Sequence, residues 1–202
     1  MQNTNIKLGR DGDKMGLFGC GVLRRFFLVA GFVGFSLFGL GLLTGVAGSG
    51  PISGLKPLDE NGHMQISAQD RCPVCAMKVS AHKKFAGAIQ LTGGQTFYFC
   101  GTGCMIRSWI HPEIFLNASK ADLNKSVVQD YFSGRQVDGQ AVYWVAGSDV
   151  VGPMGRALVP IMDEGQVAVF NKRHGGKAVF RLSEMTDEKW LQLTGKKAVP
   201  QK

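Results

Sequence analysis

The sequence predicts an α+β fold in which two small ββαβ-type units follow an N-terminal transmembrane helix. Three observations lead to this prediction. They are a long uncharged run near the start of the 202-residue chain, a Gly-Gly turn between two β-prone segments, and an order of strand, strand, helix and strand that occurs twice. The predicted parts are a cytoplasmic segment (1–25), a transmembrane helix or signal-anchor (26–48), a linker (49–70), a first unit with a cysteine-rich metal site (71–135) and a second unit (136–195).

The uncharged run from residue 26 to residue 48 predicts a single membrane-spanning helix. A helix of that length measures about 35 Å, whereas the hydrocarbon core of a bilayer is about 30 Å thick. Basic residues such as Arg24 and Arg25 precede the run. The positive-inside rule therefore places the N-terminus in the cytoplasm and everything after residue 50 in the periplasm, anchored to the inner membrane. A cleaved signal peptide is the alternative, with residues 46–48 as a small-residue cleavage site.

The first unit follows a linker that is rich in Gly, Ser and Pro. Thr92-Gly93-Gly94 separates two apolar, β-prone segments and is typical of a hairpin turn. A short helix is expected to end before Pro112, because proline disfavours the helical conformation of the residue before it. The expected elements are strands at 85–91, 95–100 and 126–132 and a helix at 101–111.

The second unit repeats this order. Its expected elements are strands at 141–146, 157–161 and 177–182 and helices at 163–174 and 183–193. Gly175-Gly176 predicts the end of the first of these helices, because glycine readily adopts the left-handed conformation that closes a helix. Ser183 is the expected N-cap of the last helix.

Four cysteines lie in two close pairs, and the hairpin between the pairs can bring them together. Cys72 and Cys75 form a Cys-x-x-Cys pair. Cys100 and Cys104 stand four residues apart at the start of the predicted helix, so they share one helix face. A helix N-terminus lowers the pKa of a thiol and favours the thiolate that metals need. The pattern predicts a metal site.

Nearby methionines indicate a soft metal. Met77 follows the first cysteine pair by two residues, and Met154 lies in a Gly-Pro-Met-Gly turn outside any periodic apolar stretch. Thioether sulfur suits Cu(I), whereas structural zinc sites use cysteine and histidine. For Met77, packing beneath the cysteine pair is the alternative role. We therefore expect Cu(I) ahead of Zn²⁺, with ligands drawn from one set: Cys72, Cys75, Met77, Cys100, Cys104 and Met154.

Two other interpretations of the cysteines stay open. One is a closed, four-cysteine structural zinc site of treble-clef type, which would make the protein an interaction module. The other is a pair of disulfides, because the periplasm is oxidising. A redox role for the Cys-x-x-Cys pair is less well supported, because no thioredoxin-like βαβ pattern surrounds it.

Composition and motifs exclude other classes of function. The net charge is +8, but the sequence has no Lys/Arg-rich run with interleaved aromatic residues and no nucleic-acid-binding motif, so nucleic acid is not an expected partner. It also has no nucleophile elbow, phosphate-binding loop or HExxH arrangement. We therefore expect neither enzymatic activity nor a small-molecule substrate.

Taken together, these motifs resemble the NosL family of accessory proteins of nitrous oxide reductase. The resemblance covers roughly residues 65–185. Where the family has Cys-x-x-Cys-Gly-Met, this sequence has Ala76 in place of the glycine. The matching motifs are Cys-x-x-Cys-Ala-Met at 72–77, Gly-Cys-Met at 103–105, Asp-Tyr-x-x-Gly at 130–134, Gly-Pro-Met-Gly at 152–155 and His-Gly-Gly at 174–176. The Cys-x-x-x-Cys pair also resembles the TRASH-type heavy-metal module.

The resemblance implies a periplasmic, membrane-anchored Cu(I)-binding metallochaperone that delivers copper for the maturation of nitrous oxide reductase. Its partner would be that enzyme or its copper-assembly machinery. The resemblance also implies a fold of two ββαβ units and copper ligation by Cys72 or Cys75, Met77 and Met154. Family members are usually tethered as lipoproteins, whereas this sequence predicts a helical anchor.

Overall fold

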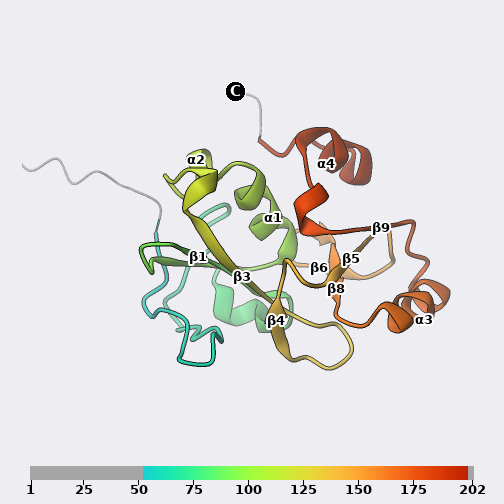
Figure 1. The fold of residues 1–202 in the computed structure, drawn as a ribbon, viewed down its shortest axis with the longest axis horizontal. Helices are drawn as coiled ribbons and strands as arrows, with labels where there is room; N and C mark the ends of the chain where they lie inside the picture. Colours follow the sequence, from blue (N-terminus) through green and yellow to red (C-terminus); the bar gives the residue numbers. More distant parts are fainter. Residues whose placement is uncertain (1–51, 200–202) are drawn as a thin grey trace, which may run out of the picture. The chain divides into compact units, whose positions relative to one another are not determined.

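The first sheet contains the hairpin between the two cysteine pairs. The computed structural model describes residues 52–199, and in it four antiparallel strands lie in the order β2–β1–β3–β4 (Figure 1). The strands are β1 (Gly87–Leu91), β2 (Thr96–Phe99), β3 (Leu123–Gln129) and β4 (Gln136–Asp138). Every residue of β2 is buried, so this strand is covered on both faces, because successive side chains of a strand point to opposite faces.

Helix α1 (Thr102–Ile110) packs on β1 and β2 and leads into the short helix α2 (Pro112–Phe115). As predicted, α1 stops before Pro112. Cys104 and Met105 in its first turn are buried, so the start of the helix lies inside the fold and not on its surface. Residues 52–199 also contain three 3₁₀ segments, η1 (Val79–Phe85), η2 (Lys120–Asp122) and η3 (Leu182–Glu184).

The described part of the predicted linker, residues 52–70, packs against the first sheet. The Tyr98 hydroxyl donates to the carbonyl of Lys56 at 2.8 Å and accepts from the N–H of Gln65 at 3.1 Å. The buried Asp70 carboxylate accepts from two backbone N–H groups of the same segment. These bonds fix the chain that leads into the first cysteine pair.

The second sheet has three antiparallel strands in the order β8–β5–β9. The strands are β5 (Tyr143–Ala146), β8 (Val159–Ile161) and β9 (Ala178–Phe180), and helix α3 (Glu164–His174) packs on β5 and β8 (Figure 1). Between β5 and β8 the chain makes a separate hairpin from β6 (Val151–Gly152) and β7 (Gly155–Arg156). The last helix is α4 (Asp187–Thr194).

The mixed helix-and-sheet fold predicted from the sequence is confirmed, and the two sheets share one topology. In each sheet two strands pair, a helix follows, and the third strand pairs with the free side of the first. The first pair is closed by the predicted glycine turn. Gly94 has a φ of +83°, a conformation that glycine adopts without steric cost. The second pair is joined instead by the longer connection that contains the β6–β7 hairpin.

One hydrophobic core includes residues from both sheets. Phe97 and Met105 contribute to it from the first sheet and α1, and Trp144 and Phe180 contribute from the second sheet. A smaller cluster, which includes Phe170, fills the space between α3 and the second sheet. The metal-binding cysteines predicted from the sequence belong to the larger core: Cys72, Cys100 and Cys104 are buried in it and Cys75 packs against it.

The last helix begins later than predicted. Residues Leu182–Glu184 form η3, and α4 starts at Asp187 and not at Ser183. Thr186 is its N-cap and accepts from the N–H of Lys189 at 3.2 Å. Ser183 and Thr186 can both serve as an N-cap. Only Thr186 is followed directly by two acidic residues, which are favourable in the first turn of a helix.

The predicted cytoplasmic segment (1–25) and membrane helix (26–48) lie outside the described residues. Among residues 52–199, no helix combines the length and the apolar character that crossing a bilayer requires.

Candidate metal centre

The first cysteine pair lies in a tight turn that closes on itself. The N–H of Ala76 donates to the carbonyl of Cys72 at 2.8 Å, and the N–H of Cys72 donates to the carbonyl of Met77 at 3.0 Å. A bridge between Arg71 and Lys78 continues the pairing outward. Ala76 has a φ of +60°, which places it in the left-handed region. The turn therefore points both thiols to the same side.

The second pair lies where β2 passes into α1. Cys100 directly follows β2, Gly101 is the N-cap, and Cys104 lies in the first turn of the helix. Cys100 therefore lies before the helix and, contrary to the prediction from the sequence, does not share a helix face with Cys104, but the extended backbone at Gly101 still leaves the two sulfurs 3.9 Å apart. The N–H of Met105 donates to the carbonyl of Gly101 at 3.2 Å, so the first helical bond forms next to the thiols.

The structure brings all four thiols together. Their sulfur atoms lie within 4.8 Å of one another, and the four cysteines are free thiols. Cys75 Sγ lies 3.4 Å from Cys100 Sγ, and Cys104 Sγ lies 3.9 Å from each of these two. A disulfide would need about 2.05 Å. In a tetrahedron of sulfurs about 2.3 Å from a metal, the sulfurs are about 3.8 Å apart, so this group has room for one metal ion at its centre.

Hydrogen bonds among the thiols lower the pKa of Cys72 and, together with burial, raise the pKa of Cys100 and Cys104. Hydrogen bonds with the Cys100 and Cys104 thiols lower the pKa of Cys72 far below its ordinary value, despite burial. Hydrogen bonds with Cys100 and Cys72, together with burial, raise the pKa of Cys104. For Cys100 the bond to Cys104 lowers the pKa, but the bond to Cys72 and burial outweigh it and raise the pKa overall. The Cys72 thiol therefore ionises easily, whereas Cys100 and Cys104 keep their protons until a cation enters, so metal binding at these two thiols must release protons.

The two predicted methionine ligands occupy different settings. Met77 is half-buried and packs against the main core. Met154 lies in the turn between β6 and β7 and its side chain is 50% exposed. Met154 and Cys104 line one cavity of about 550 Å³. The structure thus groups the four cysteines and places Met154 on the wall of the cavity that Cys104 also lines.

The β6–β7 hairpin is held against the start of α1. A methyl group added at Gly101 would lie only 3.1 Å from Cγ of Pro153, so the absence of a side chain permits this close approach. A hydrogen-bonded chain fixes the entry to the hairpin: the Tyr131 hydroxyl lies 3.0 Å from His174 Nε2, and His174 Nδ1 lies 2.8 Å from Asp149 Oδ1.

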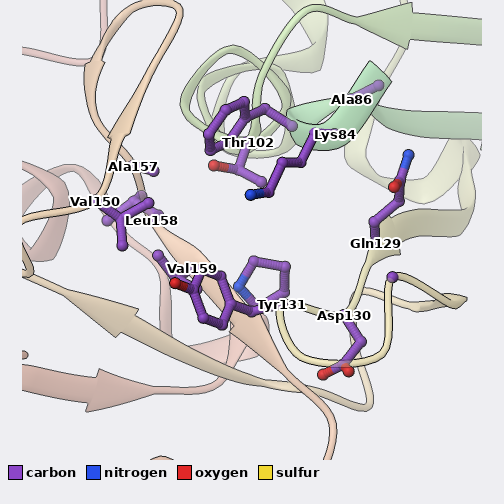
Figure 2. Close-up of a pocket in the computed structure, with 13 residues that line it drawn as sticks. Lys84, Ala86, Thr102, Gln129, Asp130, Tyr131, Val150, Ala157, Leu158 and Val159 are labelled. Atoms are coloured by element: carbon purple, nitrogen blue, oxygen red, sulfur yellow. The ribbon is translucent and has the colours of Figure 1, made fainter. Parts of the chain in front are cut away.

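A smaller cavity of about 60 Å³ adjoins this region and shares Thr102 with the larger one. In Figure 2 the amine of Lys84 reaches into it between Thr102 and Tyr131, while the carboxylate of Asp130 points away. That carboxylate instead accepts from Ser133 and from the N–H of Met162, which fixes the loop after β3. This cavity holds no group of metal-ligating side chains within residues 52–199.

The sequence did not reveal the charged side chains around the larger cavity. They come from α1, from β7 and from the chain after α4, so no local pattern connects them. They are Arg107, Arg156, Lys196 and Lys197.

Comparisons with known proteins by family model, by sequence and by structure agree with one another. The model of the NosL family matches residues 63–190. The copper-binding lipoprotein NosL of Stutzerimonas stutzeri is 31% identical over 127 residues, which make up 61% of this chain and 65% of that protein. The crystal structure of the copper chaperone NosL from Shewanella denitrificans matches with a TM-score of 0.54 and 19% identity, over 66% of this chain and 99% of that one. At that identity the structural match shows a shared fold.

Proposed function

The chain belongs to the NosL family, and from this premise we propose that it is a Cu(I)-binding metallochaperone. The observation that carries the proposal is the group of four thiol sulfurs within 4.8 Å of one another, in a chain whose relatives are named a copper-binding lipoprotein and a copper chaperone and not enzymes. Soft sulfur donors are the ligands that Cu(I) prefers.

The net charge of the loaded site favours Cu(I) binding by two or three of the four thiols. Four thiolates around Cu(I) would leave a net charge of −3 in a site where Cys72, Cys100 and Cys104 are buried, whereas two thiolates leave −1. A neutral thioether adds a donor without adding charge. We therefore propose that two or three of the cysteines bind Cu(I), and that Met154, or Met77, completes the site.

The further steps of the proposal concern location and partner. The chain would be anchored in the inner membrane by residues 26–48, with residues after 50 in the periplasm. It would deliver copper to nitrous oxide reductase or to the machinery that assembles its copper centres. The family and the soft donor set support this role, because copper handed on by ligand exchange needs an adaptable site.

A structural zinc module is the second candidate. The sulfurs of Cys75, Cys100 and Cys104 are 3.4 to 3.9 Å apart, near the value of about 3.8 Å for a tetrahedral four-thiolate zinc site, and three of the four thiols are buried. The two candidates differ in what holds the fold together. A carrier must stay folded when its cargo leaves, whereas many structural zinc modules unfold without the metal.

The test is anaerobic metal competition on the full chain, purified in detergent and fully reduced. We expect one Cu(I) per chain, measured against a chelator of known affinity, and the metal-free protein should keep its far-UV circular dichroism and a cooperative unfolding transition. Tight zinc that Cu(I) cannot displace, together with an unfolded metal-free chain, would establish the zinc module instead.

Methionine variants test the thioether. Met154→Leu should weaken Cu(I) binding about tenfold, or about 1.4 kcal/mol, and leave the fold intact. Met162→Leu is the matched control, because Met162 is similarly exposed (45%) but does not line the cavity. Met77→Leu distinguishes ligation from packing at the other position. Unchanged Cu(I) affinity in both Met77→Leu and Met154→Leu would rule out thioether ligation.

A further inference from the structure

The cavity beside the metal centre carries a concentrated positive charge. Four cationic side chains line it, and none of the described residues that line it has a carboxylate. The cations come from α1 (Arg107), from β7 (Arg156) and from the chain after α4 (Lys196 and Lys197). Because several like charges in a concave surface reinforce one another, such a cavity attracts anions.

Within the described chain these cations have only neutral partners, one of which is the Phe115 ring, whose centroid lies 5.0 Å from Cζ of Arg107. Arg107 donates to the backbone carbonyl of Ala198, and Arg156 donates to the carbonyl of Ser148 at 2.7 Å. Among the ion pairs of residues 52–199, none includes any of the four. The arginines are therefore oriented by neutral acceptors, which leaves their charge available, and both lysines are exposed.

The remaining walls of the cavity are apolar or carry the metal centre. Pro153, Leu193 and Trp190 supply apolar surface, and Cys104 and Met154 line the same space. A volume of about 550 Å³ is much larger than a single inorganic ion. It lies in the size range of pockets that hold a substantial organic ligand or several side chains. An occupant that matches these walls carries both carboxylates and apolar groups.

We propose that this cavity is the docking site for an acidic segment of the protein that exchanges metal with this chain. Aspartate and glutamate side chains of the segment would meet the four cations, and an apolar or thioether side chain would enter beside Cys104 and Met154. This deepens the function proposed above and rests on it, because it names the kind of partner that uses the metal centre.

The test uses the full chain and a short synthetic peptide in which Glu alternates with Leu around one central Met. Binding is measured by fluorescence anisotropy, with metal-free and with Cu(I)-loaded protein, at low and at physiological ionic strength. We expect the peptide to bind, and to bind more weakly in salt, because salt screens exposed charges. A peptide with Lys in place of Glu should not bind.

A pair of double variants locates the site. Lys196→Gln/Lys197→Gln should weaken peptide binding about tenfold or more. The matched control is Lys120→Gln/Lys125→Gln, which removes the same charge from exposed positions of η2 and β3 outside the cavity. Thermal unfolding shows that both double variants are folded. If peptide affinity falls equally in the two double variants, the effect comes from net charge alone, and the docking site is overturned.

Other outcomes also decide the matter. Failure of the acidic peptide to bind at low ionic strength overturns the proposal. Complete displacement of the peptide by inorganic phosphate at millimolar concentration would make the cavity a small-anion site and overturn it as well. If the chain binds Cu(I) but not the peptide, the docking site fails and the metal carrier stands. If it binds the peptide but not Cu(I), the carrier fails.

Discussion

Ala76 lies between the second cysteine and Met77, in a backbone conformation that favours glycine. Its φ of +60° costs an L-residue with a Cβ atom about 1–2 kcal/mol. The NosL-type motif has glycine at this place, and glycine adopts the left-handed conformation without steric cost. This chain forms the same turn with alanine.

Ala76→Gly should therefore stabilise the metal-free, reduced protein. Relief of the strained φ outweighs the entropy that glycine adds to the unfolded chain, and the exposed methyl group contributes no packing. We expect a gain of up to about 1 kcal/mol in the free energy of unfolding, measured by denaturant titration. Ala81→Gly is the control: Ala81 is exposed and has no positive φ, so that change should destabilise by about 0.5–1 kcal/mol. A loss of stability in Ala76→Gly would contradict the strain.

The cysteines of the site could be predicted from spacing, but its surroundings could not. A Cys-x-x-Cys pair and a second pair at a predicted helix start are joined by a predicted hairpin, so sequence spacing alone indicates that they belong to one site. The cavity cations lie on three segments that only the tertiary fold brings together. Met77 and Met154 show the same limit, because sequence context alone could not distinguish a residue packed against the core from one on a cavity wall.

At the scale of elements, one histidine at the end of α1 contacts both α2 and α4. His111 ends α1, as its place before Pro112 predicted. Its Nδ1 lies 3.0 Å from Glu113 of α2 and its Nε2 lies 2.8 Å from Asp187 in the first turn of α4. Burial lowers the pKa of His111, but the hydrogen bonds with Asp187 and Glu113 outweigh burial and raise the pKa above its ordinary value.

This bridge should make the stability of the protein depend on pH. Because the folded state raises the pKa of His111, the stabilisation is fully present below the ordinary histidine pKa of about 6.5 and is lost as pH rises through the folded pKa. We expect His111→Asn to cost about 0.5–1 kcal/mol at pH 5.5, where both carboxylates are still ionised, and less at pH 8.5. Chemical denaturation at several pH values measures this difference.

A matched variant isolates the bridge. The matched variant is His82→Asn, which changes a histidine of η1 that takes no part in these contacts. If the cost of His111→Asn rises with pH, or stays constant, the ion pairs contribute nothing and only the loss of packing remains.

The predicted ends of helices and strands agree with the structure where the sequence has a strong local signal. The Gly-Gly turn, Pro112 and Gly175 each mark a boundary that the structure keeps. The strands β4, β6 and β7 are two or three residues long, so they carry no readable alternation and were missed. β6 and β7 pair only with each other, and β4 pairs with the strand that precedes it, β3.

At the scale of the whole molecule, one core joins the two sheets. Trp144 and Phe180 of the second sheet stack with ring centroids 6.4 Å apart and belong to the same core as the buried cysteines beside the first sheet. The repeated topology could be inferred from the order of elements. The shared core could not, because alternation along a strand shows which face is buried and not what covers it.

This core predicts that residues 52–199 unfold in one transition. Tryptophan fluorescence, far-UV circular dichroism and the reactivity of the buried thiols should change together in the metal-free chain. Phe180→Ala should cost about 3–5 kcal/mol and expose those thiols at correspondingly lower denaturant. Val179→Ala, on the same strand but 43% exposed, should change little. Thiols that stay protected after the second sheet has unfolded would show two independent units.

The connection between β5 and β8 differs from its counterpart in the first sheet. A tight turn joins β1 and β2. The connection between β5 and β8 instead contains the β6–β7 hairpin, an arm that packs against Gly101 and includes Met154. Neither sheet depends on this arm for its strand pairing. Under the two proposals, a change in the arm can therefore alter the thioether of Met154 and the docking cation Arg156 together, while both sheets keep their strand pairing.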